Sequence, residues 1–263
     1  CMNLDGFFGL APSMSPLHPA YVEGDLLFVH ACGSPDPSRS HFDAQRFMEV
    51  GKANDPFLIT GWLGRHLSSV APADPGAILR AVGIGTGLPK VLVGGAGAIP
   101  VPNLDTFGLL GASGTRSARS ALFDQMYAQV ADPLHATAAT TLATINLLNS
   151  IDFATYQPAG GATYNVSDAL GYALKTSAAL IKAQVGVEAI AIDVNGWDTH
   201  TGQGVFTGTM SVLMSRLASA MAAFHRDLSA SPGNGYVVAV VSEFGRRVQE
   251  NGSQGTDHGH GNA

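Results

Sequence analysis

The clearest helical pattern along the chain lies in residues 209–228. Apolar side chains recur there every three or four residues, which places them on one face of a helix; they are Leu213, Leu217, Met221, Phe224 and Leu228. Shorter patterns of the same kind predict further helices. These cover residues 41–50, 57–69, 118–130 and 137–148, and a segment that begins near Asn165 or Ser167 and ends at Val185. In the second of them, Trp62 and Leu63 are expected to face inward.

Short apolar runs without helical spacing predict β-strands. They lie at residues 26–31, 78–84, 91–93, 189–194 and 236–241. The last run is almost entirely apolar, as is typical of a strand that is covered on both faces. Stretches rich in glycine and proline predict loops between these elements, at residues 1–25, 94–116 and 152–165. Strands that alternate with helix-length connections favour one α/β domain over residues 1–263, with a mainly parallel sheet between helical layers.

Composition narrows the class of protein. The chain has 263 residues, of which 46% are hydrophobic and 13% charged, which is enough apolar material for a sizeable core. Its net charge of −6 gives no basic surface for nucleic acid, and no apolar run is long enough to span a membrane. Cys32 is expected to be a small buried residue in a strand, and a bridge between Cys1 and Cys32 remains an alternative.

Two clusters of acids and histidines suggest a metal site. Asp198 and His200 follow the predicted strand 189–194 and offer one oxygen and one nitrogen ligand, which suits a divalent metal ion. The second cluster supplies three more potential ligands, Asp257, His258 and His260. Because ligands bind beyond the carboxyl ends of parallel strands, we expect the clusters to meet. The alternatives are loop side chains bonded to the backbone and a histidine-rich surface tail.

Two further acids end predicted strands. Asp193 ends strand 189–194 and could bind a metal or orient His200. Glu243 follows strand 236–241, where it could be a metal ligand or a general base. The alternative for Glu243 is an ion pair with Arg246 or Arg247, and Arg246 could instead bind an anionic substrate.

Ser40 follows a predicted strand and begins a predicted helix, where free N–H groups favour an anion. Its hydroxyl could be a nucleophile whose pKa a metal lowers, or it could simply cap the helix. Ser38 is the competing hydroxyl. Arg39 and His41 flank Ser40 and could contact an oxyanion.

Five motifs that occur in order resemble the DUF1501 family of bacterial proteins. They are Phe8-Gly9-Leu10, residues 33–45, Gly196-Trp197-Asp198-Thr199-His200, Ser242-Glu243-Phe244-Gly245-Arg246 and Gly255-Thr256-Asp257-His258-Gly259. The resemblance implies a relation to the alkaline phosphatase and sulfatase superfamily, with a three-layer α/β/α sandwich and one or two metals at the strand ends. By that analogy Ser40 is the nucleophile, Asp198 and His200 bind one metal with His258 or His260, and Asp193 or Glu243 serves another.

The resemblance also implies a periplasmic or exported location, although the first residues show no export signal. The chain departs from the pattern of the family in three ways. The flanking strand expected at the N-terminal end and the one expected at the C-terminal end are both missing, so we expect a fragment. In addition, Glu243-Phe244 stands where the superfamily usually has Asp-His. One metal is therefore a safer prediction than two.

The leading hypothesis is a metal-dependent hydrolase of phosphate or sulfate esters that uses Zn, Mn, Ca or Mg. Its substrate would be a small anionic ester or a sulfated or phosphorylated glycan. One alternative is a non-catalytic exported protein that keeps the fold, binds a metal and recognises a polysaccharide or a partner. The other, a metal-free serine hydrolase, is less favoured because the chain has no G-x-S-x-G elbow.

Overall fold

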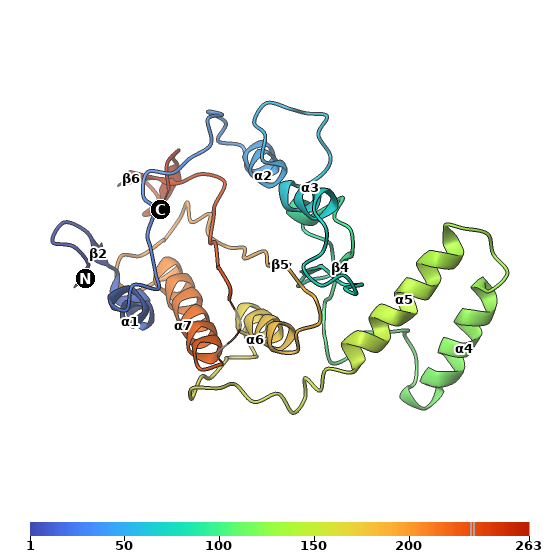
Figure 1. Ribbon diagram of the computed structural model, residues 1–263. Coiled ribbons are helices and arrows are strands. Elements are labelled where there is room, and N and C mark those ends of the chain that lie inside the picture. Colours follow the sequence, from blue (N-terminus) through green and yellow to red (C-terminus); the bar gives the residue numbers. More distant parts are fainter. Residues whose placement is uncertain (232, 234, 263) are drawn as a thin grey trace.

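The computed structural model describes residues 1–231, 233 and 235–262. The protein is a mixed α/β structure in which helices surround a small parallel sheet (Figure 1). No helix among the described residues is both long enough and apolar enough to cross a membrane.

The sheet has three strands in the order β4-β3-β5. The central strand β3 (Ala81–Gly83) pairs in parallel with β4 (Ala98–Pro100) on one side and with β5 (Ala189–Ala191) on the other. Two antiparallel pairs lie outside this sheet. They join β1 (Met2–Asn3) to β2 (Gly9–Leu10) and β6 (Arg246–Glu250) to β7 (Thr256–His258).

The helical segments cover the sheet and extend from it. The α-helices are α1 (His18–Val22), α2 (His41–Val50), α3 (Trp62–Ser69), α4 (Arg116–Tyr127), α5 (Leu134–Asn149), α6 (Ala169–Lys182) and α7 (Thr209–Ser229). Short 3-10 helices are η1 (Pro12–Leu17), η2 (Lys90–Leu92) and η3 (Ser113–Thr115). Helices α6 and α7 lie side by side, whereas α4 and α5 form a hairpin that projects from the rest of the molecule (Figure 1).

The core has a part on each side of β3, because successive residues of a strand point to opposite faces. Val82 belongs to a cluster with Leu148 of α5 and Leu180 of α6, whereas Ala81 packs with Leu67 of α3. A third cluster fills the contact between α6 and α7, with members such as Leu174, Phe224 and Leu228. The sheet is thus held between helices, and the segments that follow β5 leave it at one edge.

Several predicted elements are confirmed. Helix α2 has the predicted bounds, α7 extends one residue past them, and α4 and α5 lie within a few residues of the predicted helices. Strands β3 and β5 are shorter than predicted.

Other predictions are wrong. Residues 26–31 and 236–241 are not strands, because neither segment pairs with another strand among the described residues. Val237 is 94% exposed, which is the opposite of the buried strand that we expected. Residues 91–93 coincide largely with η2, and β4 lies in the predicted loop instead.

Three local predictions also need correction. Helix α3 begins at Trp62, whose side chain is exposed rather than inward. Asp168 caps α6 in place of Asn165 or Ser167, since its carboxylate accepts a hydrogen bond from the Leu170 amide. Both cysteines are free and exposed, so Cys32 is not buried and no bridge to Cys1 forms.

Candidate metal centre

Asp198 is the centre of a polar cluster at the β6–β7 hairpin. Its Oδ1 atom lies 2.9 Å from His258 Nε2 and 3.0 Å from His200 Nε2. Its Oδ2 atom lies 3.3 Å from His41 Nε2. The Arg246 guanidinium also contacts Oδ1 through Nη1. One carboxylate is therefore surrounded by three imidazoles and a guanidinium.

Four separate segments bring these side chains together. His41 begins α2, Asp198 and His200 lie in the loop after β5, Arg246 begins β6 and His258 ends β7. Residues Arg246 and His258 face each other across the β6–β7 pair. The Thr256 amide donates to the Thr199 carbonyl at 3.2 Å, which ties the loop after β5 to β7.

Gly255 allows the loop and the hairpin to approach closely. A Cβ atom at this position would lie 2.2 Å from the backbone carbonyl of His200, so only glycine fits. Asn251 adds a second link, because its Nδ2 donates to the His200 carbonyl and to Asp257 Oδ1, each at 3.0 Å. The position of His200 is therefore fixed by the hairpin.

The Nδ1 atom of each imidazole faces an oxygen atom on the outside of the cluster. His41 Nδ1 lies 2.6 Å from Glu243 Oε1, His200 Nδ1 lies 3.3 Å from Asp257 Oδ1, and His258 Nδ1 lies 2.8 Å from the Arg39 carbonyl. Carboxylates and carbonyls only accept hydrogen bonds, so this pattern assigns the proton of each neutral ring to Nδ1. The lone pairs on Nε2 are then directed at Asp198, as in histidines that bind a metal.

The distances inside the cluster suit a shared cation. One ligand atom each from His41, Asp198 and His258 lies within 4.8 Å of the other two, so this group could hold a metal ion. His200 Nε2 and His258 Nε2 are 3.0 Å apart, and both cannot carry a proton at that separation. Ligands at ~2.0–2.2 Å from a metal ion lie roughly 3 Å from each other, which matches the spacing around Asp198.

The charges of the acids are set by their hydrogen bonds. Partial burial raises the pKa of Asp198, but the hydrogen bond from Arg246 and the contact with His258 outweigh it and lower the pKa to about 2. Burial also raises the pKa of Glu243, and the hydrogen bond with His41 brings it below its ordinary value. Hydrogen bonds from Asn251 and His200 lower the pKa of Asp257. All three carboxylates are therefore charged at neutral pH.

Phe244 forms an apolar wall beside the cluster. Its buried ring lies 4.8 Å from the ring of His41 and 4.7 Å from that of His258, measured between centroids. Phe244 thus packs on two of the imidazoles. The resemblance implies a histidine at the position of Phe244. The imidazole of His41, from α2, lies beside the phenylalanine that is found there.

Ser40 lies between two residues that contact the cluster, Arg39 through its carbonyl and His41 through its ring. It occupies the N-cap position of α2, but its side chain caps no backbone amide. Ser38 Oγ accepts a hydrogen bond from the Ser40 amide at 3.2 Å. The side chain of Arg39 is exposed.

Two predicted ligands lie elsewhere. Asp193 is exposed and lies near Glu49, whose pKa is raised by its own burial and then by the charge of Asp193. The ring of His260 lies against Gly33, and its carbonyl accepts from the Gly245 amide at 3.1 Å. Neither side chain contacts Asp198 among the described residues. Asp257 and Glu243 contact imidazoles rather than Asp198.

His41 is the residue whose place the sequence analysis missed. We expected it to contact an oxyanion, and the structure puts its Nε2 atom against Asp198. The signal that could have found it is the position of His41, which directly follows the candidate nucleophile Ser40 at the start of a helix.

Comparison with protein families identifies a model that covers most of the chain. A family model described as "Protein of unknown function (DUF1501)" matches residues 7–263. Neither the curated proteins nor the solved structures gave a match.

Proposed function

We propose that this chain, which belongs to the DUF1501 family, is a metal-dependent hydrolase of phosphate or sulfate esters. The observation that supports this most directly is the convergence of imidazole Nε2 atoms on Asp198. Asp198, His200 and His258 would hold a divalent ion, which when bound polarises the ester and lowers the pKa of an attacking hydroxyl. The alkaline phosphatase-like three-layer architecture and an exported location are part of the same proposal and rest on family resemblance.

Ser40 is the proposed nucleophile. It begins α2, where backbone N–H groups and the helix dipole favour an anionic substrate. Its hydroxyl is not used to cap the helix, and the residues on both sides of it contact the cluster. These features favour Ser40 over Ser38, whose hydroxyl already accepts from the Ser40 amide.

Arginine side chains supply positive charge for the substrate. The guanidinium of Arg246 lies beside Asp198, and the exposed side chain of Arg39 precedes Ser40. The exposed guanidinium of Arg39 could bind two oxygens of a phosphate or sulfate group at once, whereas that of Arg246 already donates to Asp198 and Thr256 and would supply charge alone. The proposed substrate is therefore a small anionic ester or a sulfated or phosphorylated glycan.

The reaction would proceed in two displacements. In the first, a bond forms between Ser40 Oγ and phosphorus or sulfur, the ester bond to the alcohol breaks, and the alcohol leaves with the proton from Ser40. In the second, water attacks the same atom, releases phosphate or sulfate, and returns a proton to Ser40 Oγ.

The test is an assay of aryl phosphates and aryl sulfates with Zn, Mn, Ca and Mg, using the purified protein. We expect turnover that a chelator abolishes. We expect Ser40→Ala to lower kcat by ~1,000-fold or more while metal binding is retained, because the nucleophile is lost. Ser38→Ala is the matched control and should keep most of the activity.

Turnover by Ser40→Ala at the wild-type rate would contradict the proposed nucleophile. Metal binding without turnover on any of these esters would favour the non-catalytic alternative. Turnover that is insensitive to chelator would point to a metal-free serine hydrolase.

A further inference from the structure

Glu243 and His41 form the shortest carboxylate–imidazole contact of the centre, at 2.6 Å. They come from elements that are 202 positions apart in the sequence. The second oxygen of Glu243 lies 3.1 Å from Ser242 Oγ, and the ring of Phe244 packs on His41. Ser242 therefore holds the Glu243 carboxylate, and Phe244 packs on the face of the His41 imidazole. Together these contacts leave the imidazole little freedom to rotate.

The far nitrogen of this imidazole has no hydrogen-bond partner among the described residues. His41 Nε2 is a buried atom that faces Asp198 Oδ2 at 3.3 Å without making a hydrogen bond. With the proton on Nδ1, a nitrogen lone pair and a carboxylate oxygen face each other across this distance. That arrangement is unfavourable, because a buried polar atom without a partner is costly, and a cation between the two atoms would relieve it.

We propose that Glu243 is a positioning residue that holds His41 as a fourth ligand, so that the centre selects a transition-metal ion such as Zn²⁺ over Mg²⁺ and Ca²⁺. The inference rests on the proposed metal centre and deepens it. Three imidazole nitrogens and one carboxylate oxygen suit Zn²⁺ and similar ions. Mg²⁺ and Ca²⁺ prefer oxygen ligands in larger number.

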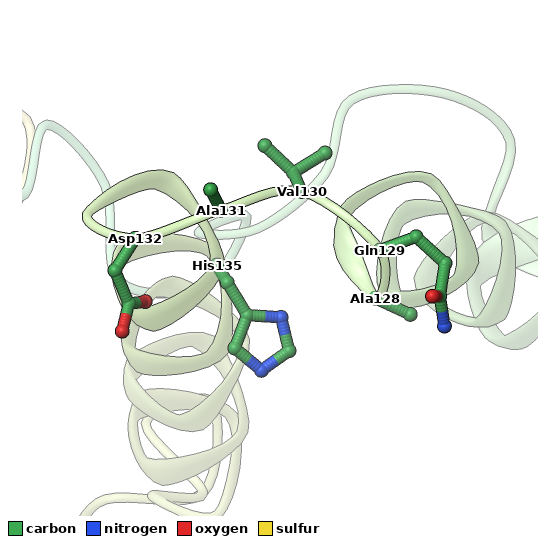
Figure 2. A pocket seen from close by; sticks show the side chains of 6 residues that line it. All are labelled: Ala128, Gln129, Val130, Ala131, Asp132 and His135. Atoms are coloured by element: carbon green, nitrogen blue, oxygen red, sulfur yellow. The ribbon is translucent and has the colours of Figure 1, made fainter.

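Two histidines outside the centre determine the control variants for a metal-binding experiment. Glu23, Asp25 and His225 form a second group that could hold a metal ion, so all variants should be made in a His225→Ala background. His135 lies in a shallow hollow at the turn between α4 and α5, together with Asp132 (Figure 2). This hairpin projects on the side of the molecule away from β6 (Figure 1), so His135→Ala should leave Zn²⁺ binding unchanged.

The experiment measures Zn²⁺ affinity by competition with a chelating dye and records the visible absorption of bound Co²⁺. We expect Glu243→Ala to weaken Zn²⁺ binding by ~10–100-fold, as is typical when a group behind a ligand is removed. Glu243→Gln should restore most of the affinity, because its amide oxygen still accepts from Nδ1–H. His41→Ala should weaken binding further and reduce the Co²⁺ absorption, and millimolar Mg²⁺ or Ca²⁺ should not displace Zn²⁺.

The outcomes separate this inference from the proposed function. If Asp198→Asn loses Zn²⁺ but Glu243→Ala and His41→Ala bind it like the parent, the inference is wrong and the hydrolase proposal stands. Displacement of Zn²⁺ by Mg²⁺ or Ca²⁺ would also overturn it. If the parent binds no ion, both fall. Without metal, each variant must have the same melting temperature as the His225→Ala parent protein. If Glu243→Ala melts at a lower temperature, the Zn²⁺ affinity of His41→Gln tests instead whether His41 is a ligand.

Discussion

At the scale of single residues, the most completely buried charge lies away from the candidate centre. Asp227 of α7 is fully buried, and its carboxylate contacts Lys182 of α6. It also accepts hydrogen bonds from the hydroxyls of Tyr156 and Tyr164 at 2.7 and 2.9 Å, and from the Ala159 amide at 2.6 Å. One acid thus fastens the 152–165 loop to two helices.

Replacing Asp227 with asparagine should destabilise the protein by about 3–5 kcal/mol, because the ammonium group of Lys182 is left without its counter-charge. Urea unfolding at pH 7 measures this. Asp152→Asn, which changes an exposed acid in the same loop, is the control and should shift the free energy of unfolding by less than about 0.5 kcal/mol.

The same residue predicts a pH dependence. Burial raises the pKa of Asp227, but hydrogen bonds from Lys182 and Tyr156 outweigh it and bring the pKa below 3.8. The stability that the charge supplies is complete above pH 3.8 and is lost as the pH falls through the lower folded-state value. Wild type should therefore lose more stability than Asp227→Asn on acidification, and parallel losses would contradict this.

Residue types and their spacing were sufficient to select Asp198, His200, Arg246 and His258, which the structure brings together. They were not sufficient for the contact of His41 with Glu243, because nothing local in the chain encodes a pair 202 positions apart. Asp193 and His260 are close in sequence to residues of the cluster, but their side chains do not contact Asp198. Proximity in sequence therefore does not determine where a side chain points.

At the scale of elements, helices were more predictable than strands. A helix such as α2 satisfies its backbone within itself, so its period and its ends are written locally. A strand needs a partner, and the apolar run 236–241 shows that composition alone does not supply one. The opposite holds for β4, which lies in a glycine-rich stretch that predicts a loop but is a strand because it pairs with β3.

The α4–α5 hairpin gives a prediction at this scale. Leu148 of α5 is buried in the core beside the sheet, whereas α4 buries no residue and its Leu122 is 57% exposed. Leu148→Ala should cost about 2–5 kcal/mol of stability by leaving a cavity. Leu122→Ala is the matched change and should cost less than about 0.5 kcal/mol. Equal costs in denaturant unfolding would mean that α4 packs more closely than described.

At the scale of the whole molecule, the apolar surface is unevenly covered. The sheet and the α6–α7 contact are buried, but segments 26–31 and 236–241 lie outside any ladder among the described residues, with Leu27 and Val237 among their exposed side chains. Exposed apolar segments with free backbone groups are prone to pair with another strand.

Hydrogen exchange followed by mass spectrometry can test this arrangement. The amides of β3 should exchange slowly because each neighbouring strand pairs with it. Those of 236–241 should exchange close to the rate of an unstructured peptide, because no backbone hydrogen bond protects them among the described residues. Slow exchange in 236–241 would mean that a further strand covers this segment in solution.

The spread of the candidate centre along the chain has a consequence for biosynthesis. Arg39 and His258, which are joined by a hydrogen bond, lie 219 positions apart. Because a ribosome releases the chain from its N-terminus, the α2 side of the centre emerges long before β7 does. The His41 imidazole must therefore remain without its carboxylate partners until Asp198 and Glu243 have been synthesised. Any ion that needs all of these ligands could be taken up only after β7 has been synthesised.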